Sequence, residues 1–281
     1  MGALKFLRRS MIYVFLILLA FIMIYPMFWM FASSFKPNEE IFTSLSLFPK
    51  NSTGLTAYVN GLKGTGQYSY ATFFKNTFVM VIPTVLFTII SSVLTAYGFA
   101  RFNFRFKKPL FAMVIGTLLL PQEVLIVPRY LLFNKFGWLN SFLPFFVPAM
   151  LATYSFFIFM MVQFIRGIPK DIDEAAYIDG CNSFRIFIQI IVPLCKPAIF
   201  SVAIFQTVWR WNDFFGPLLY ITSVSKYPVS LALRMAIEAG ETVYWNQSMA
   251  LSLVCMLPPV VLYLVAQRYF IDGISTSGLK G

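Results

Sequence analysis

Charged side chains are rare inside the long apolar runs of this 281-residue chain, and one pair stands out there. Arg210 and Asp213 lie three residues apart, on one face of a helix, where their charges can neutralise each other. Trp209, Trp211 and Asn212 lie beside them. Indole rings next to hydrogen-bonding groups suit a sugar, which has an apolar ring face and a rim of hydroxyls. The pair therefore serves either as a substrate contact or as a structural ion pair between helices.

A second polar group, Gln122 and Glu123, interrupts another apolar run beside Pro121. Each proline removes a backbone donor and kinks a helix. Broken helices within a membrane line protein or a water-filled cavity, so Gln122 and Glu123 are a lesser candidate for a solute pathway. A kink that serves packing alone is the alternative.

The sequence lacks the motifs and residue sets that are typical of a catalytic site. The chain has no histidine, and its three cysteines, Cys181, Cys195 and Cys255, show neither metal-ligand nor C-x-x-C spacing. The phosphate-binding order G-x-x-x-x-G-K-[ST] and a Ser/His/Asp set are also missing. We expect no cofactor or metal in this chain and no covalent chemistry, so the energy for its work must come from a partner.

The elements that carry these residues are membrane helices. The chain is 59% hydrophobic and only 12% charged, and soluble domains carry about twice that charged fraction. Its apolar runs are long enough to cross a bilayer, and no short alternating pattern predicts a barrel. We predict an all-α membrane protein with a transmembrane domain over 11–270 and short tails at 1–10 and 271–281. The six predicted spans cover 11–35, 76–100, 109–133, 141–165, 198–221 and 248–270.

The cations predict the orientation of the chain. The net charge is +11, but the Lys and Arg residues lie at the ends of apolar runs, which argues against nucleic-acid binding. Thirteen of the 22 fall in short tails and loops on one side, the cytosolic side: Lys5, Arg8, Arg9, Arg101, Arg105, Lys107, Lys108, Arg166, Lys170, Arg185, Lys196, Arg268 and Lys280. Both termini and the loop 166–197 are then cytoplasmic. The polar stretches 36–75 and 227–247 are external, each with a short helix.

The loop 166–197 is a charged island between two spans. Asp171 and Asp173 are good N-caps for a short helix, and Gly180 is a natural end for it. Ala175 and Ala176 leave a small-residue surface that another protein can approach closely. The segment is therefore predicted to be a contact surface.

A second short helix is predicted after Gly180. Asn182 can cap it, and an apolar stripe at helical spacing follows. Two prolines, Pro193 and Pro197, are expected to end the pattern. The stripe consists of Phe184, Phe187, Ile188 and Ile191.

This loop resembles the EAA loop of ATP-binding-cassette (ABC) importer permeases. The family pattern is Glu-Ala-Ala, Gly after three residues, then Ile and Leu-Pro. The matching residues are Glu174, Ala175, Ala176, Gly180, Ile190 and Pro193, with Val192 in place of the usual Leu and Asp179 as a further feature of the sugar-importer branch. The resemblance implies that these residues couple the chain to an ATPase subunit.

A second segment supports the same resemblance. Residues 211–218, WNDFFGPL, are similar to a signature of carbohydrate importer permeases, and residues 34–37 and 267–270 match that branch too. The chain resembles the MalG-like permease subunits of carbohydrate ABC importers, which implies a type I importer permease in the bacterial inner membrane. It also implies the usual partners: a second permease, two ATP-binding subunits that hold ATP and Mg²⁺, and an extracytoplasmic solute-binding protein.

The resemblance implies import of a sugar, with an oligosaccharide expected. A glycerol-phosphate-type solute is the alternative, because Arg210 could serve an anionic group if Asp213 did not neutralise it. An ATP-independent secondary transporter predicts relay carboxylates and repeated halves, and neither is evident in the sequence. A membrane-embedded enzyme would need a catalytic constellation, which the sequence lacks.

Overall fold

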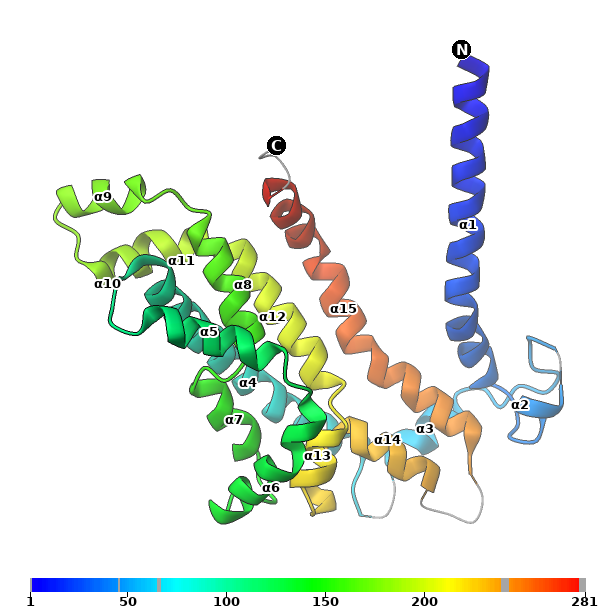
Figure 1. The fold of residues 1–281 in the computed structure, drawn as a ribbon. Coiled ribbons are helices and arrows are strands. Elements are labelled where there is room, and N and C mark those ends of the chain that lie inside the picture. Colours follow the sequence, from blue (N-terminus) through cyan, green and yellow to red (C-terminus); the bar gives the residue numbers. More distant parts are fainter. Residues whose placement is uncertain (1, 45, 65–66, 239–242, 278–281) are drawn as a thin grey trace. The chain divides into compact units, whose positions relative to one another are not determined.

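Every regular element in the described part of the chain is a helix (Figure 1). The computed structural model describes residues 2–44, 46–64, 67–238 and 243–277, with side chains described from residue 6 to 266 except at 238. The all-α membrane fold predicted from the sequence is confirmed. The side chains of Lys5 and Arg268 and all of Lys280, which were assigned above to the cytosolic side, lie outside the described residues.

The long helices are those that the apolar runs predict. Four segments of the described chain are long and apolar enough to cross a bilayer alone: Phe6–Ser33, Tyr70–Arg101, Leu143–Arg166 and Trp245–Ala266. Two bent pairs raise the number to the six predicted if each pair is one span. The second pair, Ser183–Leu194 with Lys196–Trp211, begins inside the loop 166–197 that was predicted to be cytosolic. The helices concerned are α1 (Gly2–Ser33), α4 (Tyr70–Arg101), α5 (Lys107–Leu118), α6 (Ile126–Lys135), α7 (Leu143–Met150), α8 (Ser155–Arg166), α12 (Lys196–Trp211) and α15 (Trp245–Ser277).

Breaks within the apolar runs place polar groups inside the spans. The pair that contains α5 and α6 is bent by 103°, with the 3-10 turn η1 (Gln122–Leu125) at the break. Leu151–Tyr154 separate α7 from α8, and Ala152 there adopts a left-handed φ of 56°. The run 198–221 is two helices, because α12 ends at Trp211 and α13 (Phe215–Tyr220) begins after Phe214.

The two prolines of the charged island do not end its second helix, which corrects the expectation from sequence. Pro193 lies in α11 (Val192–Leu194), which continues the helix that begins at Ser183, so this helix passes Pro193 and ends one residue later. Pro197 lies in the first turn of α12, where a proline is tolerated because the amide that it lacks would have no helical partner. The chain instead bends at Cys195, by 72° between Ser183–Leu194 and Lys196–Trp211.

The predicted apolar stripe on this second helix is also wrong. The helix begins as α10 (Ser183–Ile186) and continues as the π-helix η2 (Phe187–Ile191). A π-helix closes its hydrogen bonds one residue later than an α-helix, so side chains that would share a face are rotated apart. Ile186 and Ile191 are fully buried, whereas Phe184 and Ile188 are exposed.

The chain divides into two compact units, of which the first comprises residues 1–71 and 232–257. It contains α1, α2 (Glu40–Thr43), α3 (Thr56–Lys63) and the start of α15. The short helix expected in the stretch 36–75 is α3, and the one expected in the stretch 227–247 is α14 (Val229–Glu238). Residues 239–242 lie outside the described chain. The side chain of Asn38 holds the unit together, because it accepts from Trp245 N at 2.7 Å and donates to the Val243 carbonyl at 2.9 Å.

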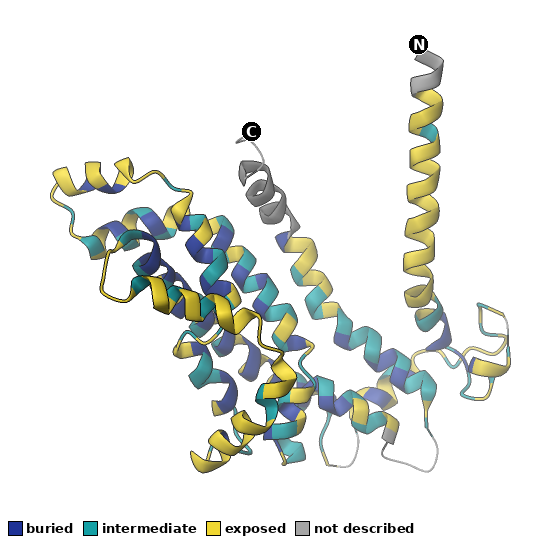
Figure 2. Ribbon diagram, viewed as in Figure 1, coloured by how far each residue is buried: buried dark blue, intermediate teal, exposed yellow. Residues whose placement is uncertain are grey.

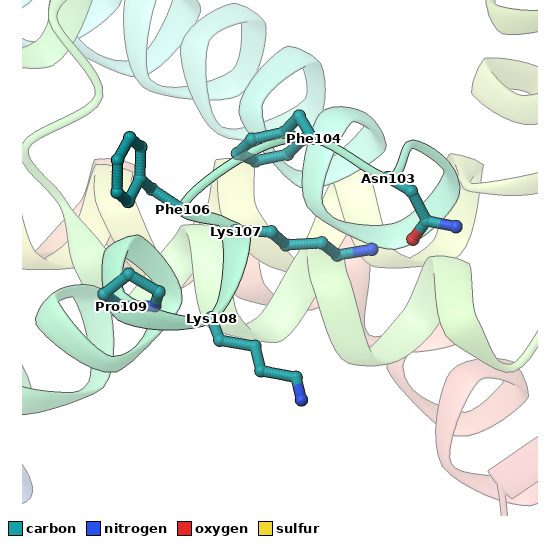
Figure 3. A pocket seen from close by; sticks show the side chains of 6 residues that line it. All are labelled: Asn103, Phe104, Phe106, Lys107, Lys108 and Pro109. Carbon is teal, nitrogen blue, oxygen red and sulfur yellow. The ribbon is translucent and has the colours of Figure 1, made fainter.

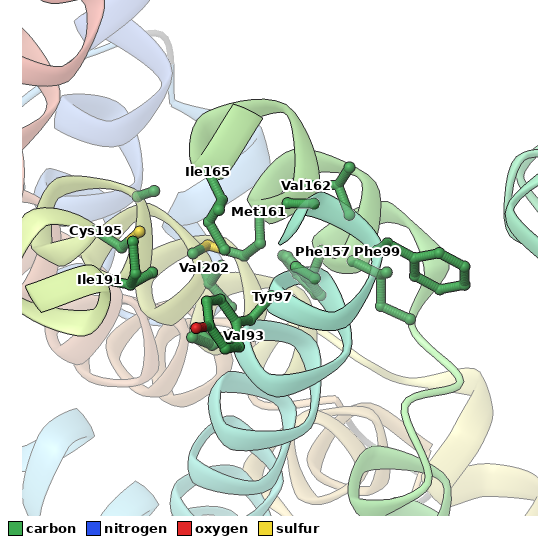
Figure 4. Close-up of a cluster of buried hydrophobic side chains, with 14 of the residues drawn as sticks. Val93, Tyr97, Phe99, Phe157, Met161, Val162, Ile165, Ile191, Cys195 and Val202 are labelled. Atoms are coloured by element: carbon green, nitrogen blue, oxygen red, sulfur yellow. The ribbon is translucent and has the colours of Figure 1, made fainter. Parts of the chain in front are cut away.

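The second unit comprises residues 72–231 and 258–281 and contains the charged island. Its core lies where the end of α4 meets α8, η2 and α12 (Figure 4). Tyr97, Met161, Ile191 and Val202 are among its buried members. By contrast, α5 has no buried residue among its own side chains, and its apolar surface is left for lipid or a partner (Figure 2).

Candidate coupling site and substrate pathway

The charged island is built around α9 (Asp171–Ile178), which lies between α8 and α10 in the chain (Figure 1). Lys170 is its N-cap, and no side chain caps it, so the expected capping by Asp171 or Asp173 is not found. Both residues lie instead inside the first turn with Glu174. Three carboxylates there still favour the helix, because its N-terminal end carries partial positive charge.

The end of α9 is set by Gly180, as predicted. Gly180 has a φ of 80°, and two hydrogen bonds close the turn: Cys181 N to Ala176 O at 2.9 Å and Gly180 N to Tyr177 O at 3.0 Å. This pair of bonds is a Schellman closure, which favours glycine at the left-handed position. No atom lies within 4 Å of where a Gly180 Cβ would be, so backbone conformation alone selects glycine.

The two alanines of α9 differ in burial. Ala175 is exposed, but Ala176 is only 6% exposed and belongs to the core of its own chain. The surface open to another protein therefore contains Ala175 and not Ala176, which corrects the expectation that both alanines form it. Ala176 instead lets α9 lie close against the membrane helices.

The outward face of α9 also carries a residue that sequence reasoning missed. Ile178 is 87% exposed, and Glu174 and Asp179 are exposed on the same helix or directly after it. A large apolar side chain on a polar loop helix is a signal visible in sequence. The outward face thus combines charge, a small residue and an apolar anchor.

The residues after α9 connect the island to α4. The side chain of Asn182 accepts from Arg185 N at 2.8 Å, which confirms the predicted cap of α10. The Ser183 carbonyl accepts from Tyr97 OH at 3.1 Å, and the Ser183 hydroxyl lies 2.7 Å from Tyr177 OH. Of the remaining matched positions, Ile190 is half-buried against the core and Pro193 is exposed.

A buried ion pair forms a second connection to α4. Arg101, the last residue of α4, places its Nε 2.6 Å from Oδ2 of Asp173, and the two side chains are 7% and 11% exposed. The Arg101 Nη2 also donates to the Ile168 carbonyl at 3.0 Å. Burial raises the pKa of Asp173, and the Arg101 guanidinium and the Lys170 ammonium oppose that rise. No signal in the sequence joins these two positions.

Arg210, at the end of α12, is the centre of the candidate pathway group. Its Nη1 forms an ion pair with Oδ2 of Asp213, and its Nη2 donates to Tyr154 OH at 2.7 Å. The guanidinium carbon lies 5.2 Å from the centre of the Phe145 ring. The two charged side chains are 13% and 21% exposed. The arginine is therefore enclosed by partners from α7, the α7–α8 connection and the α12–α13 break.

Asp213 closes the break between α12 and α13. Its Oδ1 accepts from Gly216 N at 2.9 Å, and its backbone carbonyl accepts from Ser230 Oγ at 2.9 Å. A Cβ on Gly216 would lie 2.5 Å from Asp213 Oδ2, so glycine is required for this approach. Of the two roles left open above, this geometry favours the structural one for Arg210 and Asp213.

The aromatic members of the group point to different places. Trp211 is 5% exposed and packs on Phe74 and Phe78, with ring centres 6.2 and 5.4 Å away. Trp209 is 48% exposed and packs at one side on Phe156 and Phe157. The exposed Asn212 donates back to the Val208 carbonyl at 3.0 Å. Within residues 209–213, Trp209 and Asn212 are the exposed side chains and could contact a ligand.

Gln122 and Glu123 lie together in η1 and are exposed. Gln122 Oε1 accepts from Arg129 Nη2 at 3.2 Å, which joins η1 to α6. Arg129 is also hydrogen-bonded to Tyr220, whose ring packs on Phe145 beside Arg210. The predicted pathway residues therefore form two groups that are linked indirectly, through Arg129 and Tyr220.

A shallow hollow lies in the basic turn between α4 and α5 (Figure 3). Lys107 and Lys108 line it with Phe104 and Phe106, and Phe106 adopts a left-handed φ of 66°. Among the described residues, no group of three His, Cys, Asp or Glu side chains could hold a metal ion. The hollow contains none of the residues expected to couple or to contact substrate.

These features define a class: an all-helical, multi-pass membrane subunit with broken spans and one exposed polar helix between two of them. The chain belongs to the family of binding-protein-dependent transport system inner membrane components, whose model matches residues 77–276. It is therefore a transport permease subunit.

Individual relatives cover nearly the whole chain. It is 30% identical over 277 residues to the trehalose/maltose transport system permease protein MalG of Thermococcus litoralis, covering 98% of both chains. It is 31% identical over 263 residues to the sn-glycerol-3-phosphate transport system permease protein UgpE of Salmonella typhi, covering 91% of this chain and 92% of that one. The fold matches a bacterial ABC transporter involved in the import of the acidic polysaccharide alginate, with a TM-score of 0.81, 21% identity and coverage of 94% and 96%.

Proposed function

We propose that this chain is the permease subunit of an ABC importer for a sugar, and that the sugar is an oligosaccharide. The observation that carries the proposal is α9, an exposed polar helix ended by Gly180 in a member of this permease family. The apolar helices form the path across the bilayer. The movement that opens and closes the path reaches them through α9.

The outward face of α9 docks on an ATP-binding subunit. Glu174 supplies a charged contact, and Ala175 permits close approach. Ile178 supplies apolar area, because its side chain is 87% exposed and a partner's groove would remove it from water. Asp179 and Gly180 hold the turn after the helix, while Ile190 and Pro193 belong to its support rather than to its contact face.

The partner subunits supply the energy for transport. Two ATP-binding subunits bind ATP and Mg²⁺, a second permease completes the path, and an extracytoplasmic binding protein delivers the solute. In this arrangement α9 and both chain termini are cytosolic. ATP and solute then bias the same two states from two separate sites, which is what coupling requires.

The substrate proposal rests on relatives and on the environment of Arg210. A maltose-type permease and the alginate transporter both carry saccharides by name, whereas the similar UgpE is named for an anionic solute. Asp213 and Tyr154 engage the Arg210 guanidinium, so it is poorly placed to bind a phosphate. The half-exposed indole of Trp209 is suited to stack on a sugar ring.

Reconstitution tests both parts of this proposal. The chain is co-expressed with the neighbouring permease, ATPase and binding-protein genes, and uptake into proteoliposomes is measured with radiolabelled maltose, trehalose and sn-glycerol 3-phosphate. We expect ATP-dependent uptake of a saccharide and copurification of the ATPase. Uptake without ATP would overturn the coupling role, and uptake of glycerol phosphate alone would overturn the sugar assignment.

A further inference from the structure

Two neighbouring carboxylates on α9 have different surroundings. Glu174 is exposed, while Asp173 is buried against α4. Successive side chains on a helix are about 100° apart, so one short helix can present one acid to a partner and the other to its own chain. The outward acid lies on the proposed docking face. The buried acid, Asp173, does not lie on that face and needs a separate explanation.

Asp173 meets the very end of α4. Arg101 is the last residue of this helix, and it contacts both the Asp173 carboxylate and the Ile168 carbonyl, at 2.6 and 3.0 Å. The guanidinium thus holds the chain on both sides of the start of α9. A planar, forked cation can make both contacts at once, which a lysine ammonium cannot do with the same geometry.

A second contact lies one helical turn earlier on the same face of α4. Tyr97 OH donates to the Ser183 carbonyl at 3.1 Å, just after α9 ends. Residues four apart on a helix are neighbours, so Tyr97 and Arg101 form one edge that holds α9 before its start and after its end. Ala176 closes the space between these two points, because it is buried in the same core cluster as Tyr97.

Burial makes the Arg101–Asp173 ion pair costly to open. The two charged side chains are 7% and 11% exposed, so opening the pair would leave an uncompensated charge away from water. Contacts on the exposed outward face are made and broken at far lower cost. Opening the pair therefore costs more than breaking contacts on the outward face of α9.

We infer that the Arg101–Asp173 ion pair is the positioning joint that transmits displacement of α9 to α4, the longest helix of the second unit. This inference rests on the proposed function, since it requires that α9 receive movement from an ATPase. It assigns force transmission to the inward acid, Asp173, and leaves attachment of the ATPase to the outward acid, Glu174. Sugar contact has no part in it.

Charge reversal separates attachment from transmission. In the full complex we compare Arg101→Asp, Asp173→Arg and the double variant that exchanges the two charges. The readout is the amount of solute moved per ATP hydrolysed in proteoliposomes, with the best transported of maltose, trehalose and sn-glycerol 3-phosphate as the probe. We expect each single reversal to keep the ATPase subunit bound but to lower this ratio about 5- to 150-fold, the usual range of a coupling free energy. The exchange should recover part of the loss.

Two controls make the outcome specific. Arg105→Asp makes the same charge change in an exposed residue of the adjacent turn and should leave the ratio unchanged. Glu174→Arg should release the ATPase subunit, and if it does not, the docking proposal fails while this inference is judged separately. A normal ratio in the single reversals, or an exchange no better than the worse single variant, would overturn the inference.

Two milder variants test the same inference in case the charge-reversal variants do not fold. Asp173→Asn removes only the charge, and Asp173→Glu restores it on a longer side chain. We expect Asp173→Asn to lower the transport ratio while the complex still assembles, and Asp173→Glu to recover it. Equal ratios in the two variants would overturn the inference, because a role in packing alone does not distinguish an amide from a carboxylate.

Discussion

Arg210 donates a hydrogen bond of 2.7 Å to the hydroxyl of Tyr154, which joins the end of α12 to the start of α8. With the Asp213 ion pair on its other side, the guanidinium connects three broken segments of the second unit. The residue that looks most like a substrate ligand in sequence is thus engaged inside the protein. Its neighbours Trp209 and Trp211 differ in exposure, so substitutions can separate a structural role from a role in substrate contact.

Replacing Arg210 with Gln should destabilise the protein. The change leaves the Asp213 carboxylate partly buried without its cation, and breaking such a pair costs about 3 kcal/mol or more. We expect a lower Tm of the detergent-solubilised complex and reduced uptake of every transported solute alike. A variant with unchanged Tm but altered preference among solutes would instead assign Arg210 to the substrate.

The two tryptophans around Arg210 should respond differently to alanine. Trp211 is buried against Phe74 and Phe78, so Trp211→Ala should cost about 3–5 kcal/mol of folding stability. Trp209 is half-exposed, so Trp209→Ala should change Tm much less and should raise the solute concentration needed for half-maximal uptake. Concentration dependence of uptake is the measurement, with Tm as its control. An unchanged curve for Trp209→Ala would exclude this indole from the pathway.

Gly180 should tolerate asparagine better than alanine or valine. Its φ of 80° costs an L-residue about 1–2 kcal/mol, and asparagine adopts the left-handed region more readily than other non-glycine residues. No atom lies near the missing Cβ, so size is not the obstacle. We expect ATPase stimulation by the loaded binding protein to fall in the order Gly, Asn, Ala, Val. An order that follows side-chain size would contradict the conformational reason.

Ile178 should be an anchor for the ATPase subunit. Its side chain is 87% exposed, and burying an isoleucine fully is worth about 1.5–3 kcal/mol. Ile178→Asp should therefore weaken recovery of the ATPase with the purified permease, while the permease alone keeps its Tm. The buried Ile186 provides the matched comparison, since Ile186→Asp should lower the Tm itself. Full recovery of the ATPase with Ile178→Asp would place the anchor elsewhere.

The alanine pair offers a further test of the α9 docking face. Ala175→Trp places a bulky ring on the exposed side and should block docking without loss of insertion or stability. Ala176→Trp overfills the core of the chain, which costs about 1–3 kcal/mol or more, and should lower the yield of folded protein. Membrane yield and ATPase copurification together distinguish the two. Similar behaviour of both variants would contradict the inward position of Ala176.

The sequence determined the parts of this protein that depend on neighbouring residues. Apolar runs of membrane-spanning length predict the helices, and the Pro121-Gln122-Glu123 interruption predicts the bend between α5 and α6. Gly180 and Asn182 identify the end of α9 and the cap of α10, because left-handed backbone and N-cap hydrogen bonds are local preferences. The resemblance to the EAA loop identified the same polar helix from its sequence pattern.

Tertiary structure alone decided which way each side chain of that helix faces. A π-helix rotates the stripe after Phe184, and no local rule predicts its position. The inward direction of Asp173 and Ala176 follows from where α4 ends, and Arg101 is distant from both in the chain. The same holds for Arg210, whose hydroxyl partner Tyr154 lies in the α7–α8 connection, far from it in the sequence. Long-range packing sets these partners, because a buried charge must find its counter-charge wherever the fold provides it.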